Sequence, residues 1–365
     1  MLFLYTGGSG SPIQARQTAP IYLIFIITAI IFLLITIIGI IIKKHLDYIK
    51  SDAYRQKEMN RPTKKSDIYK IAELANLNKD DISILWDVCQ FTKCNNVFYL
   101  LTTNAEVNEL FKNAYYAMKE HKFFTDIKMN LFFECLYKLE MYVAQTKKIY
   151  STTMIPAQSI IFYISEEGEQ YPFTVVKNSK DFFIAEIPEF MAKSEHKPEK
   201  LVRNRFTFKT IDGLSYNLVT RIIRYEDTPE NKHYIILAHT DQLECQSQRH
   251  FKRDFFQEDC QFAKIHIHPE AEDPAKRYWI SESKHDGKIT NISAGGCCIQ
   301  TELPVKENQS IVVTLPSKGL TEQMPGIIRR TRKLPNGKFA LHIQFSNISI
   351  QTKNKIYALV YKYEF

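Results

Sequence analysis

The sequence predicts a multidomain α+β protein with one transmembrane helix, a small helical domain, two antiparallel β domains and a C-terminal helix. Three observations predict this order: an uncharged apolar run near the N-terminus, a long stretch with helical spacing and no Pro or Gly, and two later series of short β-branched and aromatic runs. The chain of 365 residues has room for two or three domains of roughly 150 residues. Its 45% hydrophobic and 24% charged residues exclude an intrinsically disordered chain.

A membrane anchor is predicted at residues 21–42, which are apolar and carry no charge. The run matches the ~20 residues that a helix needs to cross the hydrocarbon layer. A cleaved signal peptide is the alternative, but its apolar core is shorter and follows a basic region, whereas residues 1–20 contain only Arg16 as a basic residue. We therefore expect an uncleaved transmembrane helix.

The distribution of Lys and Arg predicts the orientation of this anchor. These residues concentrate in 43–65, a basic juxtamembrane linker, so the positive-inside rule places that side in the cytoplasm. Residues 1–20 then form an extracytoplasmic tail, and the protein crosses the cell membrane once with most of its chain in the cytoplasm. Contact of the basic cluster with anionic headgroups is a second interpretation, and a role in topology alone is the simpler one.

The net charge and the cysteines limit the class of partner and the cellular compartment. The formal net charge of +8 is a mild excess that suits an anionic membrane surface or a phosphorylated ligand. The seven cysteines are scattered and include no C-x-x-C pair, which excludes a secreted disulfide framework and predicts reduced thiols.

Residues 66–148 are predicted to form a small helical domain. Pro and Gly are absent from 63 to 155, and apolar residues recur at helical spacing throughout. The polar segment Asn78–Asp81 suits the start of a helix. No titratable cluster stands out, so we interpret this domain as a scaffold or interaction module.

A first β domain is expected at 150–240, because short β-branched and aromatic runs alternate there with turn residues. Runs at this spacing favour a small antiparallel barrel. The expected strands are Ser159–Ile164, Phe173–Val176, Phe182–Ile187, Arg205–Thr210, Tyr216–Ile223 and Tyr234–Leu237.

A polar, charged segment at 241–259 is interpreted as an interdomain linker, and a second β series follows in 260–365. The pair Asn336-Gly337 is a strong hairpin signal between its last two strands. One apolar face over Ser349–Tyr363 predicts a closing helix. The expected strands are Phe262–His268, Lys288–Ile292, Cys297–Thr301, Ile311–Leu315, Gly326–Arg332 and Phe339–Phe345.

Two motifs in the last third carry the chemistry. Arg249 and Arg253 form an R-x-x-x-R pattern in the linker, and Asn291, Ser293 and Gly296 form an N-x-S-x-x-G pattern at the end of a predicted strand. Either motif alone is weak, whereas both in this order within a β series are fairly specific. Together they resemble the PilZ domain, the bacterial receptor module for cyclic di-GMP.

The resemblance covers about residues 249–363 and implies a six-stranded PilZ barrel with a C-terminal helix. The preceding β domain resembles more loosely the split β-barrel that stands N-terminal to PilZ in flagellar brake proteins. A membrane-anchored version with a helical segment is similar to spirochaete PilZ proteins. The resemblance thus implies a split barrel at 150–240, an Arg linker at 241–259 and a PilZ domain at 260–365.

The chemistry of cyclic di-GMP suits the residues that the resemblance assigns to it: Arg249, Arg253, Asn291, Ser293 and Gly296. An Arg guanidinium matches the O6 and N7 acceptors of guanine and also pairs with phosphate oxygens. An Asn amide both donates and accepts at a guanine edge, and a Ser hydroxyl bonds to phosphate or base. The glycine pair lets the backbone approach the ligand closely.

Three departures from the family pattern stand out. Gln248 precedes the first motif, in a neighbourhood that influences whether one nucleotide or a stacked pair binds, so the stoichiometry stays open. Asn291 stands where Asp is more usual, and His342 stands where Gly is frequent. Arg330 and Arg332 share a strand face and add positive potential to the pocket or form a solvated face.

The resemblance implies a membrane-anchored, non-enzymatic receptor whose interdomain arrangement changes when cyclic di-GMP binds between the two β domains. Its partners are then the nucleotide, the bacterial inner membrane and an unidentified protein effector, such as a flagellar motor or chemotaxis component, with motility or surface behaviour as the output. A ligand-free structural adaptor that acts through protein contacts is the alternative.

Other classes are less supported. The sequence has no Gly-rich phosphate loop, no nucleophile elbow and no zinc-protease motif, so we expect no enzyme. His266, His268 and His285 lack the carboxylate or Cys pattern that would complete a metal site. The modest net charge disfavours a nucleic-acid-binding module.

Overall fold

The computed structural model describes residues 21–166, 168–195, 197–210, 214–246, 250–267, 278–316, 319–334 and 336–363. Gln248, Arg249 and His268 lie outside the described residues, as does the predicted tail at 1–20. The chain divides into two compact units, Met1–Arg61 and Pro62–Phe365, and each is described by itself.

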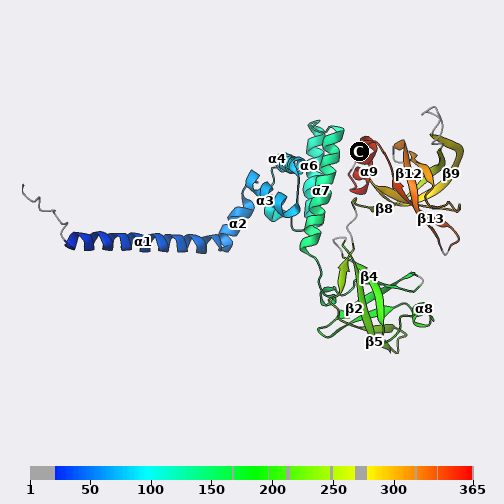
Figure 1. Cartoon of the computed structure of the whole chain (residues 1–365), viewed down its shortest axis with the longest axis horizontal. Coiled ribbons are helices and arrows are strands. Elements are labelled where there is room, and N and C mark those ends of the chain that lie inside the picture. Colours follow the sequence, from blue (N-terminus) through cyan, green and yellow to red (C-terminus); the bar gives the residue numbers. More distant parts are fainter. Residues whose placement is uncertain are drawn as a thin grey trace, which may run out of the picture. The chain divides into compact units, whose positions relative to one another are not determined.

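The first unit contains the predicted apolar helix (Figure 1). Helix α1 spans Ile21–Ile49, and its segment Phe25–Ile49 has a hydropathy of 3.2, long and apolar enough to cross a membrane. The helix runs beyond the predicted end at residue 42. Helix α2, Asp52–Asn60, occupies part of the segment that we expected to be a linker, and the Ser51 side chain caps it by accepting from the Tyr54 N–H at 3.2 Å.

The second unit begins with helices, as the lack of Pro and Gly predicted. They are α3 Lys65–Ala75, α4 Lys79–Thr92, α5 Val97–Leu100, α6 Asn104–Glu120 and α7 Asp126–Thr146. Asn78 starts α4 as predicted, because its side chain accepts from the Asp81 N–H at 2.9 Å while the Asp81 carboxylate accepts from the Asn78 N–H. The apolar faces of these helices meet in one core around Phe111, Phe132 and Phe133, which are fully buried.

The first β domain is a closed antiparallel barrel. The ring order is β4-β1-β2-β3-β6-β5, and the pairing of β4 with β5 closes it. Its strands are β1 Ile160–Ile164, β2 Gln170–Asn178, β3 Phe182–Ile187, β4 Arg203–Lys209, β5 Ser215–Asp227 and β6 His233–Ala238. The short elements η1 Thr152–Met154, α8 Glu189–Ala192 and β7 Leu243–Cys245 accompany the ring, and β7 pairs with β5. Alternate residues fill its interior, as the sequence pattern predicted.

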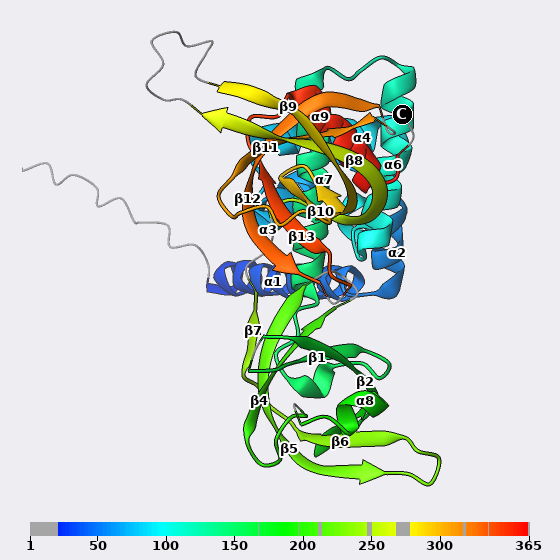
Figure 2. The ribbon, with the colours of Figure 1, turned by 90° about the vertical axis from the view of Figure 1, so that its right-hand side faces the viewer.

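The second β domain is also a closed six-stranded barrel, with the order β10-β13-β12-β11-β8-β9. Its strands are β8 Asp254–Ile267, β9 Tyr278–Ser293, β10 Gly296–Thr301, β11 Ser310–Leu315, β12 Leu320–Lys333 and β13 Phe339–Phe345. The predicted hairpin joins β12 to β13, with Gly337 at a φ of +80°. The paired strands β8 and β9 cross the barrel side by side (Figure 2).

Strands extend into both ends of the segment 241–259 that we expected to be a linker. Strand β7 lies near its start, and β8 begins at Asp254 rather than at Phe262. The sequence did not show the start of β8 because Phe255 is exposed there, whereas the half-buried positions include Asp254 and Glu258, so apolar and buried positions do not coincide. Strand β7 has only three residues, too few for a visible pattern. The connection between the two barrels is therefore shorter than predicted.

The closing helix α9, Ile350–Val360, joins the second barrel to the helical core. Ile356 and Val360 pack inside the barrel core, whereas Tyr357 and Tyr361 belong to the core of the helices. Phe133 of α7 stacks on both tyrosine rings, with centroid distances of 5.3 and 5.7 Å. The helical segment and the end of the second barrel thus share one hydrophobic core, which fixes their mutual placement.

Candidate functional site

A row of side chains crosses the outer face of the second barrel. Asn291 on β9 pairs with Cys298 on β10, Cys298 pairs with His342 on β13, and His342 pairs with Arg330 on β12. Residues that lie directly opposite in antiparallel strands share a face. The sequence neighbours Ile292, Cys297 and Ile343 fill the barrel core, so the row Asn291–Cys298–His342–Arg330 lies outside; we call it the outer row.

The second motif forms the tight turn at one end of this face. Ser293 is buried, and its hydroxyl donates to the Gly296 carbonyl at 3.1 Å. A Cβ atom on Gly296 would lie 2.1 Å from the Ile343 carbonyl oxygen, so the close approach of β10 to β13 requires glycine. Ser293 and Gly296 therefore hold the turn together, a structural role that the motif alone did not reveal.

The first motif touches the second through Phe251. A Cβ atom on Gly295 would lie 2.4 Å from the Phe251 ring, so the ring sits directly on the glycine backbone. Phe251 is half-buried and also packs against the core of the helices. The structure thus brings the linker and the glycine turn together, as a shared site requires.

Arg253 follows Phe251 by two positions and lies near the outer row. Its charge acts on His342, Cys297 and Cys298. Burial is the largest cause that lowers the pKa of His342. The nearby cations Arg330, Arg253 and Arg332 lower it further, so His342 is neutral at pH 7. Arg330 and Arg332 are exposed, and both add positive charge beside His342.

The described part of the linker contacts helices. Lys252 Nζ lies 2.5 Å from Glu140 Oε1 on α7, and Phe251 packs in the helical core. These linker residues therefore contact the helices as well as the second barrel. The predicted site at the junction of the two β domains stays a prediction. Sequence reasoning missed Lys252 and Glu140 because 112 residues separate them.

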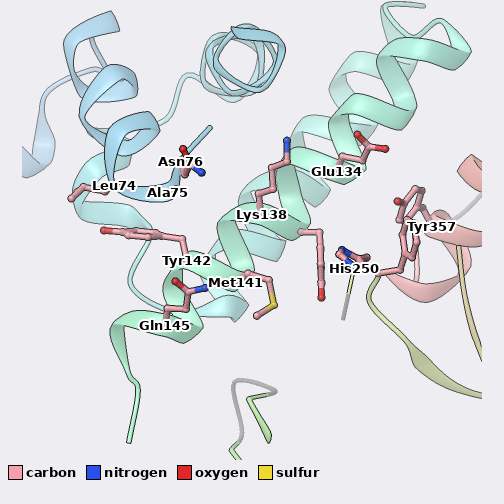
Figure 3. Close-up of a pocket in the computed structure, with 12 residues that line it drawn as sticks. Leu74, Ala75, Asn76, Glu134, Lys138, Met141, Tyr142, Gln145, His250 and Tyr357 are labelled. Carbon is pink, nitrogen blue, oxygen red and sulfur yellow. The ribbon is translucent and has the colours of Figure 1, made fainter. Parts of the chain in front are cut away.

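A pocket of about 610 Å³ opens on the helical side of the linker (Figure 3). His250 and Phe251 line it together with Glu134, Lys138 and Tyr142 of α7. The second-motif residues do not line this pocket, so it differs from the outer face that the motifs define. In the described segments no group of three His, Cys, Asp or Glu is arranged to hold a metal ion.

The comparisons with known proteins identify the last part of the chain. The PilZ domain family matches residues 247–362. No curated protein matches the chain well enough to count as a relative.

Several solved structures are similar to parts of this chain. The Bacillus subtilis inhibitor of motility MotI/DgrA is 15% identical, with a TM-score of 0.41 over 58% of this chain and 97% of that one. Escherichia coli YcgR in complex with c-di-GMP is 11% identical, with a TM-score of 0.41 over 56% of this chain and 83% of that one. The K. pneumoniae MrkH–c-di-GMP complex is 12% identical, with a TM-score of 0.40 over 55% of this chain and 85% of that one. Since these TM-scores are below 0.5, the domain assignment depends on the family match.

Proposed function

We propose, from the premise that residues 247–362 form a PilZ domain, that this protein is a non-enzymatic receptor for cyclic di-GMP. One observation carries the proposal: Phe251, inside the R-x-x-x-R motif, sits on Gly295, inside the N-x-S-x-x-G motif. Two motifs ~40 residues apart in sequence therefore meet beside a basic, half-buried face.

The ligand contacts of this proposal are Arg249, Arg253, Asn291, Ser293 and Gly296. Cyclic di-GMP carries two phosphate charges, and the cations around His342 complement them. The half-buried Asn291 amide lies in the outer row, where it faces a ligand seated on the barrel. Ser293 donates its hydroxyl proton within the turn, so we assign it an accepting role toward the ligand.

The proposed location is the bacterial inner membrane, with α1 as the anchor and everything from residue 43 onward in the cytoplasm. The apolar length of α1 and the Lys and Arg residues that follow it support this orientation. The proposed output is a changed contact with a protein effector that controls motility, chemotaxis or surface behaviour.

Ligand binding would act by changing the arrangement of the two barrels. A ligand shifts such an equilibrium only by its preference for one arrangement, and a preference of about 100-fold corresponds to about 2.7 kcal/mol. The linker that joins the barrels carries both arginines. A ligand bound to them would therefore also affect how the two barrels are arranged.

Titration of the full-length chain in detergent with cyclic di-GMP tests the proposal. We expect saturable binding that Arg253→Ala weakens by at least about tenfold, because a charge-assisted bond contributes about 1.5–3 kcal/mol. The matched control is Arg205→Ala on the first barrel, an exposed arginine whose loss should leave affinity unchanged. The absence of binding at tens of micromolar ligand would overturn the receptor function.

A ligand-free adaptor is the second candidate. It is favoured by the structural roles of Ser293 and Gly296, since a turn that needs them would keep both residues without any ligand. The same titration separates the two functions, because the adaptor takes up no nucleotide.

A further inference from the structure

Lys252, between Phe251 and Arg253, is clasped by two residues from different elements. Its ammonium Nζ lies 2.5 Å from Oε1 of Glu140 on α7 and 4.3 Å from the ring centroid of Tyr361, which follows α9. The Tyr361 hydroxyl donates to the other carboxylate oxygen, Oε2, at 3.0 Å. Both Glu140 oxygens therefore have a partner, one in the linker and one directly after α9. We call this arrangement the lysine clasp.

The clasp is shielded from water, which makes it costly to open. The Glu140 side chain is 5% exposed and that of Lys252 is 33% exposed. Burial raises the pKa of Glu140, while Lys252 and the Tyr361 hydroxyl oppose that rise. If Lys252 moved away, a buried carboxylate would lose its cation, and an unpaired buried charge is strongly unfavourable. The contact between Lys252 and Glu140 thus holds the linker to α7.

Three residues of this segment contact different parts of the chain. Phe251 rests on Gly295, Lys252 enters the clasp, and Asp254 lies 3.4 Å from Lys362 Nζ. Arg253 stands between two fixed neighbours and acts on His342 of the outer row. The direction of Arg253 therefore depends on the anchorage of Lys252.

We propose that Glu140 is a positioning residue of the nucleotide site, and this inference rests on the proposed function. Glu140 holds Lys252 and thereby orders the backbone next to it, which carries Arg253. Arg253 is then held near the outer row before the ligand binds, so less ordering is needed on binding. Binding free energies are reciprocal, so a bound ligand also strengthens the clasp. The helical segment is then a working part of the receptor that senses occupancy, and more than a spacer between membrane and barrels.

The first test compares Glu140→Gln with wild type by calorimetric titration with cyclic di-GMP, on the full-length chain in detergent. Gln keeps the shape of Glu and removes its charge, so we expect the dissociation constant to rise about 5- to 20-fold. Glu109→Gln, the same change at an exposed site on α6, is the matched control and should bind as wild type does. A thermal melt of each variant confirms that it is folded.

A merely structural role is separated from a positioning role by repeating the change in an Arg253→Ala background. If Glu140 acts through Arg253, Glu140→Gln then alters the residual affinity by less than about twofold. An unchanged 5- to 20-fold loss in that background would overturn the positioning role.

The second test needs no ligand. We expect amide hydrogen exchange over 250–254 to be at least about tenfold faster in Glu140→Gln than in wild type or in Glu109→Gln, because the clasp no longer holds the segment. Equal exchange and equal affinity in all three proteins would overturn the inference while leaving the receptor intact. A wild type that binds no cyclic di-GMP would overturn the proposed function itself, so the two failures are distinguishable.

Discussion

The two barrels are built alike, yet their glycines serve different purposes. Each barrel is a closed antiparallel ring of six strands whose alternate residues fill the interior. In the first barrel the β1–β2 turn contains Gly168, at a φ of +81°, where an added Cβ atom would meet nothing within 4 Å. In the second barrel Gly295 and Gly296 are pressed against Phe251 and β13. Both barrels therefore use glycine for chain reversal, at Gly168 in the first and at Gly337 in the second, and the second barrel also uses it for close approach.

The two barrels also differ in the residues that lie outside their cores. The second barrel carries Asn291, His342 and Arg330 in register, and the charge of Arg253 in the linker acts on His342. The first barrel meets α7 through packing, with Ala144 in its core and Met141 packed against that core. We therefore propose that function depends on this local group of residues rather than on the barrel fold that both domains share.

The largest expected effect concerns the contrast between the glycines. Gly296→Ala should destabilise the second barrel by about 3 kcal/mol, because its Cβ would lie 2.1 Å from the Ile343 carbonyl oxygen and backbone must move. Gly168→Ala should cost only about 1 kcal/mol, for its positive φ in open space. Urea unfolding of both variants measures the difference, and equal losses would contradict it.

A smaller effect is expected for the basic faces. Arg330→Ala should weaken cyclic di-GMP binding about three- to tenfold, because it removes one cation beside His342 at the edge of the outer row. Arg221→Ala, at an exposed position of the first barrel, is the matched control. Titrations at low and high salt should show a weaker salt dependence for Arg330→Ala only; a shared loss would remove the distinction between the faces.

The smallest expected effect is a pH dependence. His342 is neutral because burial, Arg330, Arg253 and Arg332 lower its pKa, and an anionic ligand would raise that pKa again. Binding then takes up a proton, so affinity should rise about two- to fivefold as pH falls from about 8 to about 6. His342→Gln should abolish this rise. A wild-type affinity that is flat or falls toward low pH would show that the ligand does not lie near His342.

Local sequence patterns predicted much of the fold. The alternation of apolar residues placed β3 and β13 at their observed bounds, and Asn78 and Asn336-Gly337 marked a helix start and a hairpin because caps and tight turns depend on a few adjacent residues. The start of β8 was not predictable, because the exposed Phe255 and the half-buried Asp254 and Glu258 reverse the usual alternation of apolar and polar residues.

The candidate site was predictable only in part. The motifs named Asn291 and Gly296, and Gly295 beside them contacts Phe251 of the linker. Their role in ligand binding stays a prediction. The lysine clasp was not predictable, since a buried pair such as Glu140 and Lys252 leaves no periodic pattern in either segment. The internal bond of Ser293 was also hidden, because a motif shows residue types and not which partner each one has.

A structure of the full-length chain with cyclic di-GMP bound is the decisive experiment for the receptor function. We expect the dinucleotide on the outer face of the second barrel, with Arg253 on a phosphate or guanine and Asn291 at a base edge, while Lys252 stays on Glu140. A dinucleotide seated in the pocket of about 610 Å³ beside α7, with the outer row bare, would contradict this placement.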